Sequence, residues 1–292
     1  MKTEGELSPN RVAPKKMDDL KFDTIGYWTE IKLNILKEYA AAYAKILNNQ
    51  RFIKHYAYID AFAGAGHHIS ETTKKIVDGS PALALTVKPQ FTHYHFVETD
   101  PARVKLLQDL SKGRTDVSIY QGDSNCILIN EVFPKCCYKD FRRALCLLDP
   151  YQLNPSWEVV LMAGKMKSIE IFLNFMIMDA NMNVLWNDAS RVAPEQKKRM
   201  NIVWGDDTWQ QVAYKIEKGL FFDFKEKAPN KDIIEAYRKR VKEIAGFKYV
   251  PEPLPMYNSK GAVIYYLFFA SHNETGARIA KSIFKKWHNK RY

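Results

Sequence analysis

The sequence contains no long apolar run, and this absence excludes one class of protein. Among its 292 residues, no stretch approaches the ~18 consecutive apolar residues that a membrane-spanning helix requires. The first 25 residues mix Lys, Glu, Asp and Pro and contain no apolar core of a secretory signal. We therefore expect a soluble, cytoplasmic protein.

Cysteines in a metal-ligand spacing are also lacking. Cys126, Cys136, Cys137 and Cys146 show no C-x-x-C pattern and no nearby His, so we expect reduced thiols in the core and no metal. Glycine and proline number only 13 each, with 46% hydrophobic and 26% charged residues. This composition excludes a collagen-like, low-complexity or wholly disordered chain and is typical of a globular protein.

Positive charge is in excess and is unevenly distributed. The chain has 44 Lys and Arg against 33 Asp and Glu, a net charge of +11, and residues 231–292 hold 13 basic against 5 acidic residues. Polyanions bind such surfaces through their phosphates. We therefore predict that the C-terminal region binds nucleic acid, DNA or RNA. The alternative is a basic solvated face without a partner.

We expect a flexible N-terminal lead over residues 1–21 and a single domain over residues 22–292. Apolar residues at three- and four-residue spacing predict an amphipathic helix over residues 27–47. Short apolar runs then predict five buried parallel strands with helices between them. These runs are Tyr56–Phe62, Tyr94–Val97, Val117–Tyr120, Ala144–Leu148 and Ile169–Phe172.

The alternation of strands and helices predicts the fold class. It indicates an α/β protein with a doubly wound, mostly parallel sheet of the Rossmann type. The distance from Asp60 to Glu98 is 38 residues, against 25 from Glu98 to Asp123 and 26 from Asp123 to Asp149. The difference predicts an extra loop over residues 67–78.

The last third of the sequence does not continue the regular alternation of strands and helices. Residues 176–230 are rich in Met, Asn and Trp and predict a helical insertion after the fifth strand. Two strand-like runs, 248–257 and 262–270, then predict a hairpin that closes the edge of a seven-stranded sheet. A last helix is expected over residues 275–287. The hairpin and this helix together close the domain over residues 246–287.

Acidic residues follow four consecutive predicted strands. Asp60, Glu98, Asp123 and Asp149 lie where the strands should end, and open α/β sheets hold their ligands there. A carboxylate at the second strand end can accept both hydroxyls of a ribose, and one at the third can accept from an adenine amino group. Each acid could instead cap the next helix, but four in succession predict a binding site.

The loop after the first strand predicts a backbone turn close to a ligand. It reads Tyr58-Ile-Asp-Ala-Phe-Ala-Gly-Ala-Gly66, and Gly64 and Gly66 allow the sharp turn. The dinucleotide fingerprint requires a third glycine at position 69, where this sequence has Ile69. A nicotinamide-dependent oxidoreductase is therefore the least favoured interpretation.

These motifs, in this order, resemble those of class I S-adenosylmethionine-dependent methyltransferases. The resemblance implies S-adenosylmethionine as the cofactor and a class I methyltransferase-like fold. It places the amino-acid portion of the cofactor at Asp60 and Gly64, the ribose at Glu98 and the adenine at Asp123. The full set of implied cofactor-binding residues is Asp60, Phe62, Gly64, Gly66, Glu98, Asp123 and Ser124.

The segment Asp149-Pro150-Tyr151 resembles the (D/N)-P-P-(Y/F) motif of methyltransferases that act on exocyclic amino groups of bases. This implies catalytic roles: Asp149 and the Pro150 carbonyl receive the amine protons, and the ring of Tyr151 stacks on the base. This sequence departs from the motif in having a single proline, which Tyr151 follows directly. Asn174, at the end of the fifth strand, is expected either to bind a substrate base or to cap the next segment.

The chain is also similar to the three-Cys-motif partner (TcmP) family. Besides the motifs above, the similarity rests on Tyr27-Trp28-Thr-Glu-Ile-Lys32-Leu, Gly79-Ser80-Pro81-Ala-Leu-Ala-Leu and Trp204-Gly205-Asp206. It implies a separate partner protein that carries the Cys motif. Trp204 and Trp209, near the basic run 197–199, are expected in the core or, alternatively, on a stacking surface for nucleic acid.

The predicted function is methyl transfer from S-adenosylmethionine to a nucleic acid base. The alternative is a cofactor-binding or catalytically silent subunit that binds nucleic acid in a two-protein system, because a fold can persist without its activity.

Overall fold

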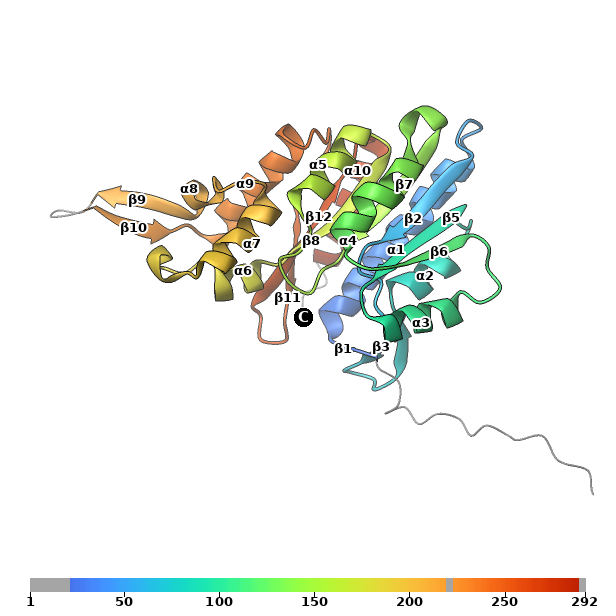
Figure 1. Cartoon of the computed structure of the whole chain (residues 1–292), viewed down its shortest axis with the longest axis horizontal. Coiled ribbons are helices and arrows are strands. Elements are labelled where there is room, and N and C mark those ends of the chain that lie inside the picture. Colours follow the sequence, from blue (N-terminus) through green and yellow to red (C-terminus); the bar gives the residue numbers. More distant parts are fainter. Residues whose placement is uncertain (1–21, 219–222, 289–292) are drawn as a thin grey trace, which may run out of the picture.

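The computed structural model describes residues 22–218 and 223–288, and the predicted lead over residues 1–21 lies outside them. A seven-stranded sheet forms its centre (Figure 1). The strands lie in the order β11 (Leu254–Tyr257), β12 (Val263–Ala270), β8 (Ile169–Phe175), β7 (Arg142–Leu148), β2 (His55–Asp60), β5 (His93–Glu98) and β6 (Val117–Gln121). The five from β8 to β6 are parallel, and β12 is antiparallel to both neighbours. The predicted fold class, an α/β protein with a doubly wound, mostly parallel seven-stranded sheet of the Rossmann type, is confirmed.

Helices cover both faces of this sheet, and each face has its own apolar core. One core receives side chains from α1 (Tyr27–Asn48), α2 (Ser80–Thr86), α3 (Pro101–Leu110) and α10 (Glu274–His288). The other receives side chains from α4 (Ser124–Ile127), α5 (Trp157–Met166), α6 (Ile177–Asn183), α7 (Pro194–Trp204), α8 (Trp209–Ala213) and α9 (Asn230–Glu243). Because the central strands are buried on both faces, their sequences are continuous apolar runs.

Side-chain caps begin several of the helices that follow strands, among them α3 and α5. At the start of α3, Asp100 accepts hydrogen bonds from the N–H groups of Ala102 (2.7 Å) and Arg103 (3.3 Å). At the start of α5, the Ser156 hydroxyl accepts from the Val159 N–H at 3.4 Å. These contacts satisfy donors that have no partner inside the helix, and so they fix where each strand-end loop stops.

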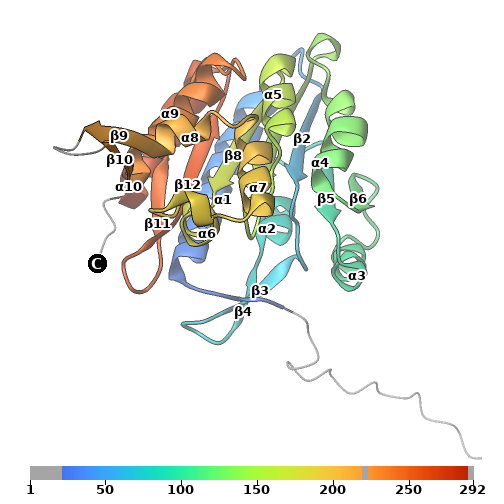
Figure 2. The same ribbon diagram turned by 60° about the vertical axis from the view of Figure 1, so that its left-hand side comes forward.

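The segment over residues 67–78, predicted as an extra loop, contains two strands. β3 (His67–Ser70) and β4 (Ile76–Asp78) form an antiparallel hairpin, and β1 (Thr24–Ile25) pairs with β3 in parallel. Figure 2 shows this small sheet below the main one, near the start of α1. The extra residues therefore build a second sheet beside the carboxyl ends of the main strands.

The insertion over residues 176–230 is helical only in its first part. After α6, α7 and α8 it forms an antiparallel hairpin, β9 (Tyr214–Lys218) with β10 (Asp223–Lys227), which projects from the body in Figure 1. Trp204 and Trp209 are each 1% exposed. The core interpretation of these two residues is confirmed, and the stacking surface is wrong.

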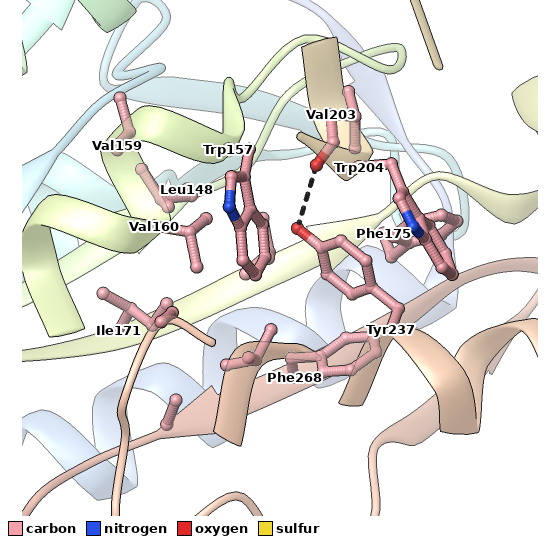
Figure 3. Packing of buried hydrophobic residues seen from close by; sticks show 14 of the residues in the cluster. Leu148, Trp157, Val159, Val160, Ile171, Phe175, Val203, Trp204, Tyr237 and Phe268 are labelled. Carbon is pink, nitrogen blue, oxygen red and sulfur yellow. Dashed lines mark hydrogen bonds between the residues drawn. The ribbon is translucent and has the colours of Figure 1, made fainter. Parts of the chain in front are cut away.

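Tyr237 of α9 joins this insertion to the main core. Its ring centroid lies 4.7 Å from that of Phe175, 5.5 Å from Trp204 and 5.9 Å from Trp157 (Figure 3). Its hydroxyl donates to the carbonyl of Val203 at 3.4 Å. The insertion is therefore packed onto β8 and α5 through aromatic contacts.

The first strand of the closing hairpin is shorter than predicted. β11 begins at Leu254 rather than near residue 248, and Tyr249 forms only an isolated bridge with Ser271. Pro251 and Pro253 lie between and have no N–H to donate to a ladder, which explains the interruption.

All four cysteines are free thiols, but they are not all in the core. Cys136 and Cys146 are buried, Cys137 is half-buried and Cys126 is exposed, so the expectation of core thiols is wrong for Cys126. Within the described residues, no helix has both the length and the apolar character needed to cross a membrane.

Candidate active site

The carboxyl ends of β2, β5, β6 and β7 meet at one edge of the sheet, and all four predicted acids lie there. Asp60 and Glu98 are the last residues of β2 and β5, and Asp123 and Asp149 follow β6 and β7. The structure thus brings the four side chains to the edge at which open α/β sheets hold ligands.

Backbone hydrogen bonds hold the loop after β2 over the sheet. The N–H of Ala61 donates to the carbonyl of Leu147 in β7 at 3.0 Å, and the N–H of Ala63 donates to the carbonyl of Val97 in β5 at 2.9 Å. The loop is therefore attached to a strand on each side of β2.

Two glycines of this loop have different surroundings. Gly64 (φ +63°) and Gly66 (φ +80°) both adopt the left-handed conformation that favours glycine. A Cβ at Gly66 would lie 2.7 Å from the Leu110 side chain of α3, whereas a Cβ at Gly64 would meet no described atom within 4 Å. Gly66 therefore turns the chain against α3, away from the cavities described below, and Gly64 leaves open space.

Glu98 is almost fully buried and fastens the loop. Its Oε2 accepts the N–H of Gly64 at 2.8 Å, and its Oε1 accepts the N–H groups of Thr99 (2.7 Å) and Asp100 (2.9 Å). The carboxylate thus ties the glycine loop to the start of α3. Among the described residues, Oε2 accepts only the Gly64 N–H and so retains a lone pair with which to accept from a ligand, whereas Oε1 also accepts the Thr99 hydroxyl at 3.2 Å.

A cavity of about 570 Å³, the Glu98 cavity, lies above β2, β5 and β6. Predicted residues that line it are Phe62, Glu98, Asp123, Ser124 and Tyr151. Asp123 also accepts the N–H of Cys126 at 2.9 Å and so caps α4. The two interpretations of this acid, helix cap and cavity wall, therefore both apply.

Asp149 lies between two polar side chains from other elements. The ammonium of Lys32, on α1, forms an ion pair with its Oδ2, and the amide of Asn174, on β8, donates to its Oδ1. Lys32 is 5% exposed and Asn174 is 2% exposed. The sheet thus places the carboxylate in a largely buried polar cluster.

A second cavity of about 250 Å³, the Asp149 cavity, adjoins this cluster. Lys32, Asp149, Pro150 and Asn174 line it, as does Gly64. It shares wall residues with the Glu98 cavity, namely Asp23, Phe62 and Tyr151. The two cavities are therefore neighbours.

Several polar atoms in the wall of the Asp149 cavity have no hydrogen-bond partner among the described residues. They are the Oδ1 of Asn174, the hydroxyl of Tyr265 and the Nδ1 of His68. Burial lowers the pKa of His68, and the Lys32 ammonium lowers it further. Buried polar atoms are normally paired, so these atoms point to a ligand with complementary groups.

Tyr151 lines both cavities and is held there by polar side chains. Its side chain is exposed, and its hydroxyl donates to Oδ2 of Asp23 at 2.5 Å. Arg103 donates to Oδ1 of Asp23 at 2.9 Å and to the Tyr151 hydroxyl at 3.4 Å. We call these three residues the Tyr151 clamp.

Asp60 lies beneath the loop and lines neither cavity. It is fully buried, and its Oδ1 accepts the N–H of Phe62 at 3.3 Å, whereas its Oδ2 has no partner among the described residues. Burial raises its pKa to about 7; the nearby Ser80 hydroxyl opposes this, and the Asp149 carboxylate adds to it.

A wide groove of about 960 Å³, the Trp28 groove, continues outward from the Asp149 cavity. The two share Gly26, Thr29 and Ile264. The rings of Trp28 and Tyr257, which line the groove, have centroids 5.3 Å apart. An aromatic surface thus leads towards Asp149.

Sequence reasoning assigned no role at the site to Lys32, Asp23 or Arg103. The position of Lys32 could have been noticed in the sequence. It lies three and four residues before Ile35 and Leu36, and this spacing places the lysine on the apolar face of the helix. For Asp23 and Arg103 the sequence held no such signal. No cluster of three or more potential metal ligands occurs among the described residues.

No protein-family model matches the chain, and no curated protein matches it in sequence. Among solved structures it is similar to protein LPL1258 of Legionella pneumophila, from the family model DUF519, with 11% identity, a TM-score of 0.50 and coverage of 88% of this chain and 92% of that one. It is also similar to the Methanococcus jannaschii fibrillarin pre-rRNA processing protein, with 15% identity, a TM-score of 0.41 and coverage of 89% of this chain and 85% of that one. A third similar structure is the N-terminal domain of EvdMO1 with SAH bound, with 13% identity, a TM-score of 0.40 and coverage of 82% of this chain and 81% of that one. The likeness to the Legionella protein shows a shared fold and says nothing of activity.

Proposed function

We propose that this chain is an S-adenosylmethionine-dependent methyltransferase in which Asp149 holds an acceptor amine. The observation that carries the proposal is the Asp149 carboxylate, held by Lys32 and Asn174 in the wall of a cavity that adjoins the Glu98 cavity. A donor in one cavity and an acceptor in the other would be in contact, which direct methyl transfer requires.

The residues of the Glu98 cavity suit an adenosyl cofactor. Its volume of about 570 Å³ lies in the ~300–1,000 Å³ range of ligand pockets. We assign the ribose hydroxyls to Glu98, the adenine amino group to Asp123 and the amino-acid portion to the loop at Gly64 with Asp60 beneath it. The open space at Gly64 supports this fit. When bound, the cofactor supplies a methyl group already activated on a sulfonium.

The chain's own residues would orient the acceptor. Asp149 and the Pro150 carbonyl accept hydrogen bonds from an amine, and the unpartnered Oδ1 of Asn174 adds a third acceptor. Lys32 keeps the carboxylate in place through its ion pair. Such fixed dipoles act strongly in a partly buried site.

We propose an exocyclic amino group of a nucleic acid base as the acceptor. The aromatic Trp28 groove supports this, because bases stack on aromatic rings. The basic region over residues 231–292 is the proposed contact for DNA or RNA, although Arg238, Arg240 and Lys286 are already paired with carboxylates. Membership of the TcmP family, a partner with a three-Cys motif and a cytoplasmic location remain predictions.

One observation favours the alternative, a catalytically silent nucleic-acid-binding subunit. Both oxygens of Asp149 are engaged, by Lys32 and by Asn174. If these contacts persist when ligands bind, the carboxylate has less capacity to accept from an amine.

Two experiments separate these functions. Calorimetric titration with S-adenosylmethionine, S-adenosylhomocysteine and NAD should show binding of the first two only. Transfer of a tritiated methyl group to pooled DNA and RNA should then occur if the chain is an enzyme. NAD binding without a response to S-adenosylhomocysteine would refute the proposal, and cofactor binding without transfer would favour the silent subunit.

Asp149→Asn tests the role of the carboxylate. The variant keeps the size but removes the charge, so methyl transfer should fall by ~10²-fold or more while S-adenosylmethionine affinity hardly changes. Asp207→Asn, an exposed change outside the site, is the matched control. Equal loss of affinity and turnover, or full activity, would remove Asp149 from the mechanism. Circular dichroism checks that the variant, which leaves Lys32 unpaired, is folded.

A further inference from the structure

A separate cavity of about 270 Å³ lies at the opposite, amino-terminal end of the parallel strands. We call it the Arg142 cavity. Its basic lining residues are His55, His93, His95, Lys135, Arg142 and Arg143. Among the described residues, no Asp or Glu lines it.

The fold explains why these side chains meet. His55, His93 and Arg142 are the first residues of β2, β5 and β7, which are parallel neighbours, and His55 is the register partner of Arg142. The short helical turn Phe133–Cys136 brings Lys135 to the same place. Since Arg142 begins β7 and Asp149 follows its end, the cavity is distinct from the proposed active site.

The cations of the cavity are held by neutral groups. Lys135 donates to the Tyr120 hydroxyl at 3.0 Å, and Arg142 donates to the Lys135 carbonyl at 3.2 Å. Arg143 donates to the carbonyl of Arg142 at 2.7 Å, and its guanidinium lies 3.9 Å from the ring centroid of Tyr138. None of the three forms an ion pair with a carboxylate of residues 22–218 or 223–288.

Two of the histidines, His93 and His95, add ring nitrogens whose charged form is disfavoured by burial. Burial lowers the pKa of His95 to about 3, with further lowering by His93 and Lys135, and burial also lowers the pKa of His93. The nearby carboxylate, Asp116, is already paired with Arg114 at 3.0 and 2.6 Å. Three uncompensated cations that share one small cavity repel one another, and an anion between them would remove this repulsion.

We propose that the Arg142 cavity binds a phosphate group. Guanidinium and ammonium donors that converge without a carboxylate match the oxygens of phosphate. The volume, about 270 Å³, is below the ~300–1,000 Å³ of pockets for larger ligands, so it suits the phosphate group itself. The group could be free or part of a nucleic acid backbone, and this inference does not depend on the proposed methyltransferase function.

Calorimetry with inorganic phosphate tests the proposal on the full chain. We expect saturable binding at one site, weakened by about tenfold or more in Arg142→Gln and in Lys135→Gln, which each remove charged donors. Lys139→Gln removes an exposed charge that does not line the cavity and should leave the affinity unchanged. Thermal unfolding without phosphate confirms that each variant folds. Absent or unsaturable binding, or an equal loss in Lys139→Gln, would overturn the proposal.

A short single-stranded oligonucleotide distinguishes the two sources. If phosphate competes with the oligonucleotide and Arg142→Gln weakens both, the phosphate group belongs to nucleic acid. If the oligonucleotide binds independently of Arg142, the ligand is free phosphate. S-adenosylmethionine affinity should be unchanged in Arg142→Gln, so failure of one proposal leaves the other standing.

Discussion

The two ends of the parallel strands carry charges of opposite sign and satisfy them differently. At the carboxyl end, Asp149 is paired with Lys32, and Glu98 accepts backbone N–H groups. At the amino end, Lys135 and Arg142 are held by a hydroxyl and a carbonyl. One end thus has internal partners for its charges, whereas the other leaves positive charge for a ligand.

The distance between the ends makes them separable. β2 has six residues, which span roughly 20 Å at ~3.3 Å each. This exceeds the Debye length of ~10 Å at 0.1 M salt, beyond which exposed charges are largely screened. Variants at one end should therefore leave the other unaffected, and the following predictions use this separation, from the largest effect to the smallest.

Asp60 and His95 should give pH dependences of opposite sign. The pKa of Asp60 rises from 3.8 to about 7 on folding, so between these values the folded state holds a proton that the unfolded state has released. Its contribution to stability therefore falls, by on the order of 4 kcal/mol, as pH rises through this window. The pKa of His95 falls from 6.5 to about 3, so its contribution rises from pH 3 to 6.5 by a similar amount.

Urea unfolding of Asp60→Asn and His95→Gln, each relative to the wild type, measures these contributions. Asp60→Asn should gain stability relative to the wild type as pH rises from 4 to 7, and His95→Gln should gain as pH falls from 6.5 to 4. Parallel profiles for the two variants would contradict the opposite shifts.

Lys32→Met should destabilise the protein by about 3 kcal/mol, because it leaves the Asp149 carboxylate without its cation. Lys37→Met on the exposed side of the same helix is the control and should change stability little. The midpoint of urea unfolding gives both values. Equal losses in the two variants would mean that helix propensity, not the ion pair, causes the effect.

Glu98→Gln should weaken S-adenosylmethionine binding by ~1–3 kcal/mol, the range for hydrogen bonds to a charged group. The variant keeps the size of the side chain but turns one of the two acceptor oxygens into an NH2 donor, so thermal unfolding must show that the loop stays attached to α3. Titration calorimetry gives the affinity, and phosphate binding at the Arg142 cavity serves as the internal control. An unchanged cofactor affinity would remove Glu98 from the cofactor site.

The smallest effect concerns the two loop glycines. Gly66→Ala should destabilise the fold by about 2 kcal/mol, because left-handed strain adds to the contact with Leu110. Gly64→Ala should destabilise the fold by about 1 kcal/mol, because it causes left-handed strain without a steric contact. It also places a methyl group in the Asp149 cavity and should therefore weaken ligand binding. Thermal unfolding and calorimetry separate the two. The reverse ranking of stabilities would contradict the assigned roles.

The main sheet could be predicted because its strands are buried on both faces, as in the run Ala144–Leu148, which lies within β7. The hairpin β3–β4 could not, since its strands are short and half-exposed and their polar residues show no alternation. The acids at the strand ends were found from their positions. Lys32 and Asp149, however, are 117 residues apart, and only the folded chain brings them together.

The Tyr151 clamp has a consequence for chain dynamics. Asp23, which binds Tyr151 through its side chain, also accepts the N–H of Ile69 through its carbonyl at 2.9 Å, just before β1. A ligand that displaced Tyr151 would thus loosen one anchor of the small sheet, and one that tightened the clamp would strengthen it. Hydrogen exchange at the Ile69 amide would then report occupancy of a site formed around residues 98 and 149.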